Sequence, residues 1–239
     1  MEDLVGNPRI GLIIPSANRL TEPQFNRYLP DDVDIHVTRL RMTGKWAKPL
    51  GQLQGVIEEA AAVLSDTKPD VIVFHCTANS MEGGLDGERR ITEWVGQASG
   101  CEAVTTSQAI TEALRELAIR KLVLISPYVE ATNQAEMRYM SEAGFEVVHE
   151  LGLGLPGSDD YIAVTPEQWL DITCDNARPE AEGYFLSCTN TRMIETIEAV
   201  ESRLARPVVS SNQAALWACL RRMGRPTSIP GLGRLCAEG

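Results

Sequence analysis

The stretch VIVFHCTANS at residues 71–80 decides the fold, because it joins a short apolar segment to a polar turn that carries a thiol. Its first four residues are β-branched or aromatic, which is typical of a strand buried on both faces of a parallel sheet. The small polar residues after Cys76 favour a turn that leads into a helix. We therefore predict a strand over 71–74 that stops at His75 and Cys76.

The same pattern recurs further along the chain. GYFLSCTNTR at 183–192 aligns with VIVFHCTANS, so Cys188 lies opposite Cys76 at an offset of 112 positions (188 − 76). Two other pairs of segments also match. RIGLIIPSAN at 9–18 aligns with KLVLISPYVE at 121–130 at the same offset. AVTTSQAITEAL at 103–114 aligns with PVVSSNQAALWACL at 207–220 after a shift of a few residues. A shared offset predicts two copies of one supersecondary plan.

Strand and helix candidates alternate along the chain between these segments. The apolar run at 9–14 and the stretch 33–40 favour strands, whereas 22–29 and the amphipathic stretch 51–66 favour helices. Such alternation predicts parallel sheet with helices on its faces. We expect an α/β fold of two similar parallel subdomains related by a pseudo-twofold axis, with the active site between them.

The repeat also predicts where the halves meet. We expect an N-terminal α/β half over 1–118 and a C-terminal α/β half over 119–211. A crossover from about 212–239 is expected to return to the first half. Because parallel α/β units bind ligands at the carboxyl ends of their strands, both cysteine turns are expected to face one cleft.

Composition and net charge limit the classes of molecule that this chain is expected to bind. The 239 residues are 44% hydrophobic, as in ordinary globular proteins, and carry a net charge of −11. An acidic surface repels nucleic-acid phosphates and anionic lipids, so neither nucleic acid nor a membrane is expected, whereas local N–H groups can still hold an anionic substrate. No signal peptide is visible in the sequence, and no apolar run reaches the roughly 18 residues needed to span a bilayer. The six cysteines have no C-x-x-C spacing. We therefore predict a cytoplasmic protein with reduced thiols. A homo-oligomer is compatible with the sequence.

The two repeated cysteines are the candidate catalytic residues. A thiol at a helix N-terminus meets backbone N–H groups, which are expected to lower its pKa. Cys76 and Cys188 could act as base and acid on opposite faces of a carbon acid, or one could add covalently while the other delivers a proton. A strand-end cysteine is more often a small buried hydrophobe, but the duplication favours function. The four other cysteines lack this symmetry and are interpreted as structural.

Small polar residues follow each of the repeated strands and could cradle a carboxylate or an enolate. Read singly, each such residue is usually a turn former or a helix cap, so the set carries more weight than any member. The candidate substrate-binding residues are Ser16, Asn18, Thr77, Ala78, Tyr128, Thr189 and Asn190.

The sequence contains no complete motif for a nucleotide cofactor or a metal ion. GLGLPG at 152–157 matches G-x-G-x-x-G, but no helix opens at its last glycine, as a dinucleotide fingerprint requires. GGLDG at 83–87 lacks the lysine of a phosphate loop and is interpreted as a flexible active-site loop. His75 and Cys76 are neighbours in an extended strand and point to opposite faces, which makes a poor metal site. We expect no organic cofactor and no metal.

Taken together, the segments RIGLIIPSANRLTEP, FHCTANSMEGG, ISPYVEATN, LSCTNTR and VVSSNQAALWACL resemble the aspartate/glutamate racemase superfamily. The most similar branch contains the maleate cis-trans isomerases and the arylmalonate decarboxylases, and the similarity spans about residues 8–225. The resemblance implies two facing α/β subdomains with the active site between them.

In maleate isomerases a cysteine that matches Cys76 adds to the double bond, and one that matches Cys188 handles the proton. The resemblance also assigns Asn18 and Tyr128 to substrate carboxylates. In arylmalonate decarboxylases the first cysteine is replaced by glycine, so Cys76 departs from that pattern. Thr77 and Tyr128 match positions that form the dioxyanion pocket of the decarboxylases, whereas Ala78 stands where a hydroxyl residue is typical and could contribute only its N–H.

These observations favour a cofactor-independent isomerase of a small carboxylate or dicarboxylate that resembles maleate cis-trans isomerase. The alternatives left open are a racemase of an amino acid or related carbon acid, an arylmalonate-type decarboxylase, and a non-catalytic carboxylate-binding protein.

Overall fold

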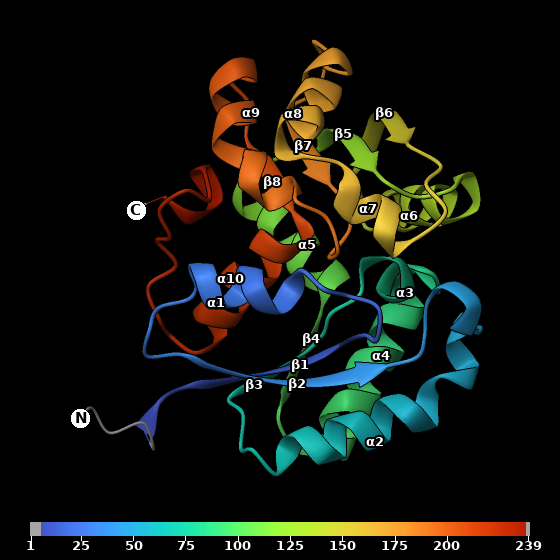
Figure 1. The fold of residues 1–239 in the computed structure, drawn as a ribbon, viewed down its shortest axis with the longest axis vertical. Coiled ribbons are helices and arrows are strands. Elements are labelled where there is room, and N and C mark those ends of the chain that lie inside the picture. The colour runs from blue at the N-terminus through green and yellow to red at the C-terminus, as the bar shows by residue number, and fades with distance from the viewer. Residues whose placement is uncertain (1–5, 238–239) are drawn as a thin grey trace.

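The computed structural model describes residues 6–237 and contains two four-stranded sheets, which lie one above the other in Figure 1. Their strand orders are β2-β1-β3-β4 and β6-β5-β7-β8, and every neighbouring pair is parallel. The strands are β1 (Arg9–Pro15), β2 (Asp34–Leu40), β3 (Val71–Phe74), β4 (Glu102–Thr105), β5 (Lys121–Ser126), β6 (Glu146–Gly152), β7 (Gly183–Leu186) and β8 (Val208–Ser210). The predicted α/β fold of two similar parallel units is confirmed.

Helices connect the strands and cover the sheets. The helices are α1 (Thr21–Tyr28), α2 (Gln54–Ser65), α3 (Thr77–Met81), α4 (Gly84–Ser99), α5 (Thr106–Glu116), α6 (Glu130–Glu142), α7 (Ser158–Ala163), α8 (Pro166–Asp175), α9 (Ile197–Leu204) and α10 (Ser211–Arg222). Short 3-10 turns are η2 (Gly44–Trp46), η3 (Leu50–Gln52), η4 (Met193–Thr196) and η5 (Arg234–Cys236). No helix within residues 6–237 is long and apolar enough to cross a membrane.

The strand register repeats at the offset seen in the sequence. Ile10 pairs with Val71 between β1 and β3, and Leu122 pairs with Gly183 between β5 and β7. Both partners are thus displaced by 112 positions. As a result, Cys76 and Cys188 each lie two residues beyond the end of equivalent strands, β3 and β7.

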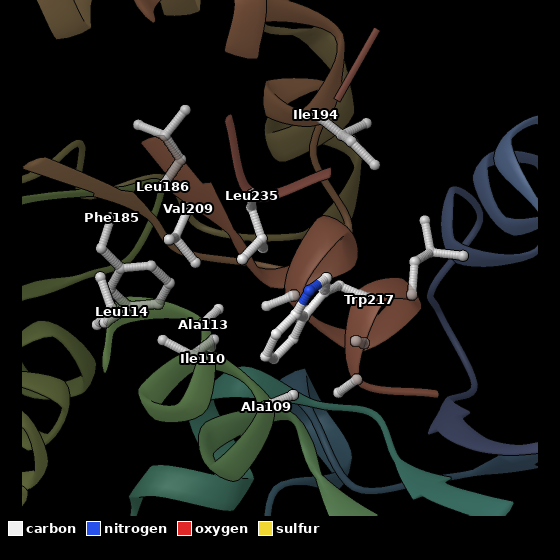
Figure 2. Close-up of a cluster of buried hydrophobic side chains, with 14 of the residues drawn as sticks. Ala109, Ile110, Ala113, Leu114, Phe185, Leu186, Ile194, Val209, Trp217 and Leu235 are labelled. Atoms are coloured by element: carbon white, nitrogen blue, oxygen red, sulfur yellow. The ribbon is translucent and has the colours of Figure 1, made fainter. Parts of the chain in front are cut away.

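Helix α10 links the two sheets. It follows β8 of the second sheet, yet it packs against α5, α1 and β3. Figure 2 shows Trp217 of α10 beside Ile110 and Ala113 of α5, in a cluster that also includes β7 and β8 residues. The apolar core is therefore continuous between the sheets. The division of the chain at residues 118 and 119 stays a prediction.

The expectation of a flexible loop over 83–87 is wrong. Helix α4 begins at Gly84, so most of GGLDG forms its first turn. Gly84 has a φ of +64°, a left-handed conformation that glycine adopts without strain, and this lets the chain turn directly from α3 into α4.

Candidate active site

The two cysteine turns open into one cavity of about 800 Å³. Most of the predicted residues line it, from both sheets: Ser16, Asn18, Cys76, Ala78, Tyr128, Cys188, Thr189 and Asn190. Both cysteines are nearly buried, with exposed fractions of 5% for Cys76 and 6% for Cys188. The strand-end geometry thus brings together residues that are more than 100 positions apart.

Thr77 is the exception among the predicted residues. It does not line the cavity, because its hydroxyl points toward α10 and donates a hydrogen bond to the Ser211 Oγ at 2.9 Å. The same Ser211 Oγ accepts the backbone N–H of Cys188 at 3.1 Å. One hydroxyl at the start of α10 therefore joins the two cysteine turns.

Cys188 has a strained backbone. Its φ is +130°, a conformation that residues with a side chain rarely adopt. Its Sγ accepts the backbone N–H of Asn190 at 3.3 Å, and the Ser211 contact fixes its own N–H. Strain of this kind persists only where the surroundings hold it, and it is concentrated at functional sites.

Asn18 ties the first turn to the second. Its Nδ2 donates to the Thr189 Oγ1 at 3.0 Å and contacts the Thr21 Oγ1 at 2.9 Å, while its Oδ1 accepts the Thr21 N–H at 2.9 Å. Its amide is therefore already engaged in holding the cavity wall. Asn190 differs, because its Oδ1 accepts the Arg19 N–H at 2.9 Å but its buried Nδ2 has no hydrogen-bond partner.

The thiols do not have the lowered pKa that helix N-termini were expected to produce. Burial raises the pKa of Cys76 to about 12, although a backbone N–H at Asn79 lowers it in part. Burial likewise raises the pKa of Cys188 to about 12, against hydrogen bonds from Tyr128 and Asn190. The expectation is wrong because α3, which follows Cys76, is only five residues long, and no helix begins directly after Cys188, where η4 starts at Met193. Desolvation of each thiolate therefore outweighs the nearby N–H groups. Thiols with such raised pKa values are protonated at neutral pH.

His75 lies behind Cys76 and is fully buried. One ring nitrogen contacts the Asn212 Oδ1 at 2.8 Å and the other contacts the Thr106 Oγ1 at 3.0 Å. Burial lowers the pKa of His75 to about 4, so the ring is neutral at pH 7. With both nitrogens engaged, His75 positions the β3 end. Within residues 6–237, no group of three or more His, Cys, Asp or Glu side chains is placed to hold a metal ion.

Sequence reasoning missed part of the cavity wall, although Asn79 belongs to the small polar residues that follow Cys76. The Asn79 Oδ1 accepts the Cys76 thiol at 3.1 Å. Tyr161 of α7 stacks edge-on with Tyr128, with 5.8 Å between ring centroids. The segment 42–49 forms the outer wall and contributes Lys45 and Lys48. No motif marks these last residues, because they come from irregular chain and a short helix.

The arylmalonate decarboxylase family model matches residues 10–236. The chain belongs to this family. Among its relatives, the maleate isomerase of Nocardia farcinica is 25% identical over 244 residues, covering 98% of this chain and 97% of the relative. The arylmalonate decarboxylase of Bordetella bronchiseptica is 26% identical over 234 residues, covering 97% of each chain.

Solved structures of the family share the fold. The maleate isomerase of Pseudomonas putida S16 with maleate superposes with a TM-score of 0.90 at 22% identity, over 97% of this chain and 98% of that one. An arylmalonate decarboxylase structure gives a TM-score of 0.84 at 26% identity, over 95% and 98%. A cysteine variant of the Nocardia farcinica enzyme, with a TM-score of 0.90 at 23% identity over 98% of this chain and all of that one, contains a covalently bound succinylcysteine intermediate.

Proposed function

We propose that this chain is a cofactor-independent isomerase that converts a small unsaturated carboxylate between its cis and trans forms, with maleate as the first candidate. The observation that carries this proposal is the pair of thiols, Cys76 and Cys188, at equivalent strand ends in one cavity. Relatives named maleate isomerase cover nearly the whole chain and support the substrate class.

In this mechanism the Cys76 Sγ forms a bond to one alkene carbon while the π bond breaks. Cys188 gives its proton to the neighbouring carbon, and the proton lost from Cys76 replaces it, so the thiol pair releases no net proton. The former double bond is then single and can rotate. Reversal of the two bond changes expels the Cys76 thiol and yields the trans isomer.

The remaining wall would hold the carboxylates. The unpartnered Nδ2 of Asn190 is a buried donor on the cavity wall, and a buried donor without a partner costs free energy until a ligand accepts from it. The Ala78 N–H lies on the opposite turn. Lys45 and Lys48 give the mouth local positive charge on a chain with a net charge of −11, which favours entry of an anion. The site needs no organic cofactor or metal in this mechanism.

Decarboxylation is the second candidate, because the matching family model is that of arylmalonate decarboxylase. There Cys188 alone would protonate an enediolate. Cys76 argues against it, since the resemblance places glycine at this position in decarboxylases. Racemisation, with the thiols acting as two bases on opposite faces, also uses both cysteines but needs no covalent bond.

The test is NMR of the dialysed, EDTA-treated enzyme with a panel of small mono- and dicarboxylates in D₂O. We expect maleate to disappear as fumarate forms. Exchange of an α-proton without isomerisation would assign a racemase, and loss of a carboxylate from a malonate would assign a decarboxylase. No reaction with any of them, together with carboxylate binding, would indicate a binding protein. Activity that disappears with EDTA and returns with one metal would contradict the proposed mechanism.

A further inference from the structure

A second acid lies behind the cavity wall. Glu136 of α6 is fully buried, and its Oε1 accepts a hydrogen bond from the Ser187 Oγ at 2.8 Å. Its Oε2 has no hydrogen-bond partner. Because a buried ionised carboxylate is costly without several donors, this single contact requires an explanation.

Glu136 is placed to act on the catalytic thiols. Ser187, its hydrogen-bond partner, directly precedes Cys188 in the chain. Ala135, the residue before Glu136, lines the cavity. A negative charge on Glu136 raises the pKa of the thiols of Cys76 and Cys188, and it acts in the same direction on the phenols of Tyr128 and Tyr161.

The acids of the elements that pack against α6 have hydrogen bonds of their own. Helices α3 and α4 and strand β6 contact α6. Glu88 of α4 accepts from Ser107 and from Tyr139, and Glu150 of β6 accepts from the Asn133 amide. Glu82, just beyond α3, is exposed and lines the cavity on the Cys76 side.

The cations and the histidine of these elements are engaged elsewhere. Arg89 of α4 pairs with Asp86 on the solvent side, and Arg90 lies over the Trp94 ring. His149 of β6 contacts Asn176 and Arg178. Burial therefore raises the pKa of Glu136 to about 8, with only the Ser187 hydrogen bond opposing it.

We propose that Glu136, a buried acid with one unpartnered oxygen that is hydrogen-bonded to the residue before Cys188, is a positioning residue whose ionisation suppresses thiolate formation at both Cys76 and Cys188. In its neutral form it leaves the cavity free of a fixed negative charge, so that a thiolate and a substrate carboxylate can occur there together. Its role in turnover rests on the proposed function, but its effect on the thiols does not.

The experiment measures alkylation of the free enzyme by iodoacetamide from pH 6 to pH 10, with Cys76 and Cys188 followed separately by peptide mass spectrometry. Thiol alkylation far below the thiol pKa rises tenfold per pH unit, because the thiolate is the nucleophile. In the wild type we expect this rise to pause near pH 8, where Glu136 ionises. Glu136→Gln preserves the size and the Ser187 contact, so its rise is expected to be unbroken.

The two proteins are expected to react equally at pH 6.5, and Glu136→Gln about tenfold faster at pH 9. Glu201→Gln is the matched control, because Glu201 is also buried with a raised pKa but receives its hydrogen bonds from Val208 and Arg234, outside the cavity wall. It is expected to retain the pause. A wild-type alkylation curve without a pause would overturn the proposal, and so would a pause that persists in Glu136→Gln. If the variant does not fold, the wild-type curve alone still tests the proposal.

A kinetic readout then tests the role in turnover. With maleate as the substrate, the wild-type KM is expected to rise above pH 8, while that of Glu136→Gln is expected to stay flat. Because alkylation needs no substrate, a normal alkylation result without turnover would contradict the proposed isomerase and leave the assignment of Glu136 standing.

Discussion

The hydroxyl of Ser211 accepts a hydrogen bond from the backbone N–H of Cys188 at 3.1 Å, and this contact sets the second cysteine turn. The same oxygen accepts the Thr77 hydroxyl at 2.9 Å, so the position of one turn depends on the other. Since Cys188 has a φ of +130°, its conformation needs such an external anchor. The relative position of the two thiols is thus held by α10 as well as by the strands that precede them.

Ser211→Ala is expected to lower turnover strongly while the protein still folds. It leaves the Cys188 N–H and the Thr77 hydroxyl without their acceptor, which costs about 1–3 kcal/mol of folding free energy. We expect kcat to fall at least tenfold, because small misplacements of a reacting group are costly. Thr173→Val is the control, since it removes a buried hydroxyl that contacts the Trp169 carbonyl of α8. Equal kcat values for the two variants would contradict the anchor.

Removing each thiol separates the mechanisms. Cys76→Ala and Cys188→Ala are expected to lower turnover by at least 10²–10⁴-fold, as for loss of a general acid or base. If Cys76 adds covalently, Cys188→Ala is expected to retain an adduct that raises the protein mass by that of the substrate. Two-base racemisation predicts no adduct, and each single variant would still exchange a proton from one face.

Cys219→Ala is the matched control for both thiols. Cys219 is fully buried with its pKa raised to about 12, like the two cavity thiols, but it lies in α10 outside the cavity. Its replacement is expected to cost stability and leave kcat unchanged. A Cys76→Ala variant with a near-wild-type rate would overturn the two-cysteine mechanism and favour decarboxylation by Cys188 alone.

The internal repeat made the fold and the equivalent placement of the two cysteines predictable. The β1–β3 and β5–β7 registers are related by the same 112-residue offset that the sequence shows, so the equivalence of Cys76 and Cys188 could be read from the sequence. The thiol pKa was not predictable, because it depends on how deeply the turns are buried. Nor were Glu136 and Tyr161, whose approach to the cavity results from tertiary packing of α6 and α7 and leaves no periodic or spacing signal.

Asn190→Asp tests the unpartnered donor in the cavity. The Asp Oδ1 can still accept the Arg19 N–H, so little change in Tm is expected. The Nδ2 donor is replaced by a carboxylate oxygen that repels an anionic substrate, and KM is expected to rise at least tenfold with a smaller change in kcat. A neutral amide analogue of the substrate is the control ligand, and it is expected to lose less affinity. Unchanged KM would remove Asn190 from the binding site.

The raised pKa of Glu136 also predicts how stability depends on pH. The folded state holds this proton up to about pH 8, whereas the unfolded chain loses it near pH 4.5, so the free energy of unfolding falls as pH rises between these values. Each pH unit in that window costs about 1.4 kcal/mol.

Glu136→Gln has no proton to lose, and its stability relative to the wild type is expected to rise from pH 4.5 to pH 8 and then level off. Urea unfolding at a series of pH values measures this difference, and Glu201→Gln, whose glutamate is less buried, is expected to show a smaller trend. A difference between Glu136→Gln and the wild type that stays constant from pH 4.5 to pH 8 would mean that Glu136 is ionised throughout.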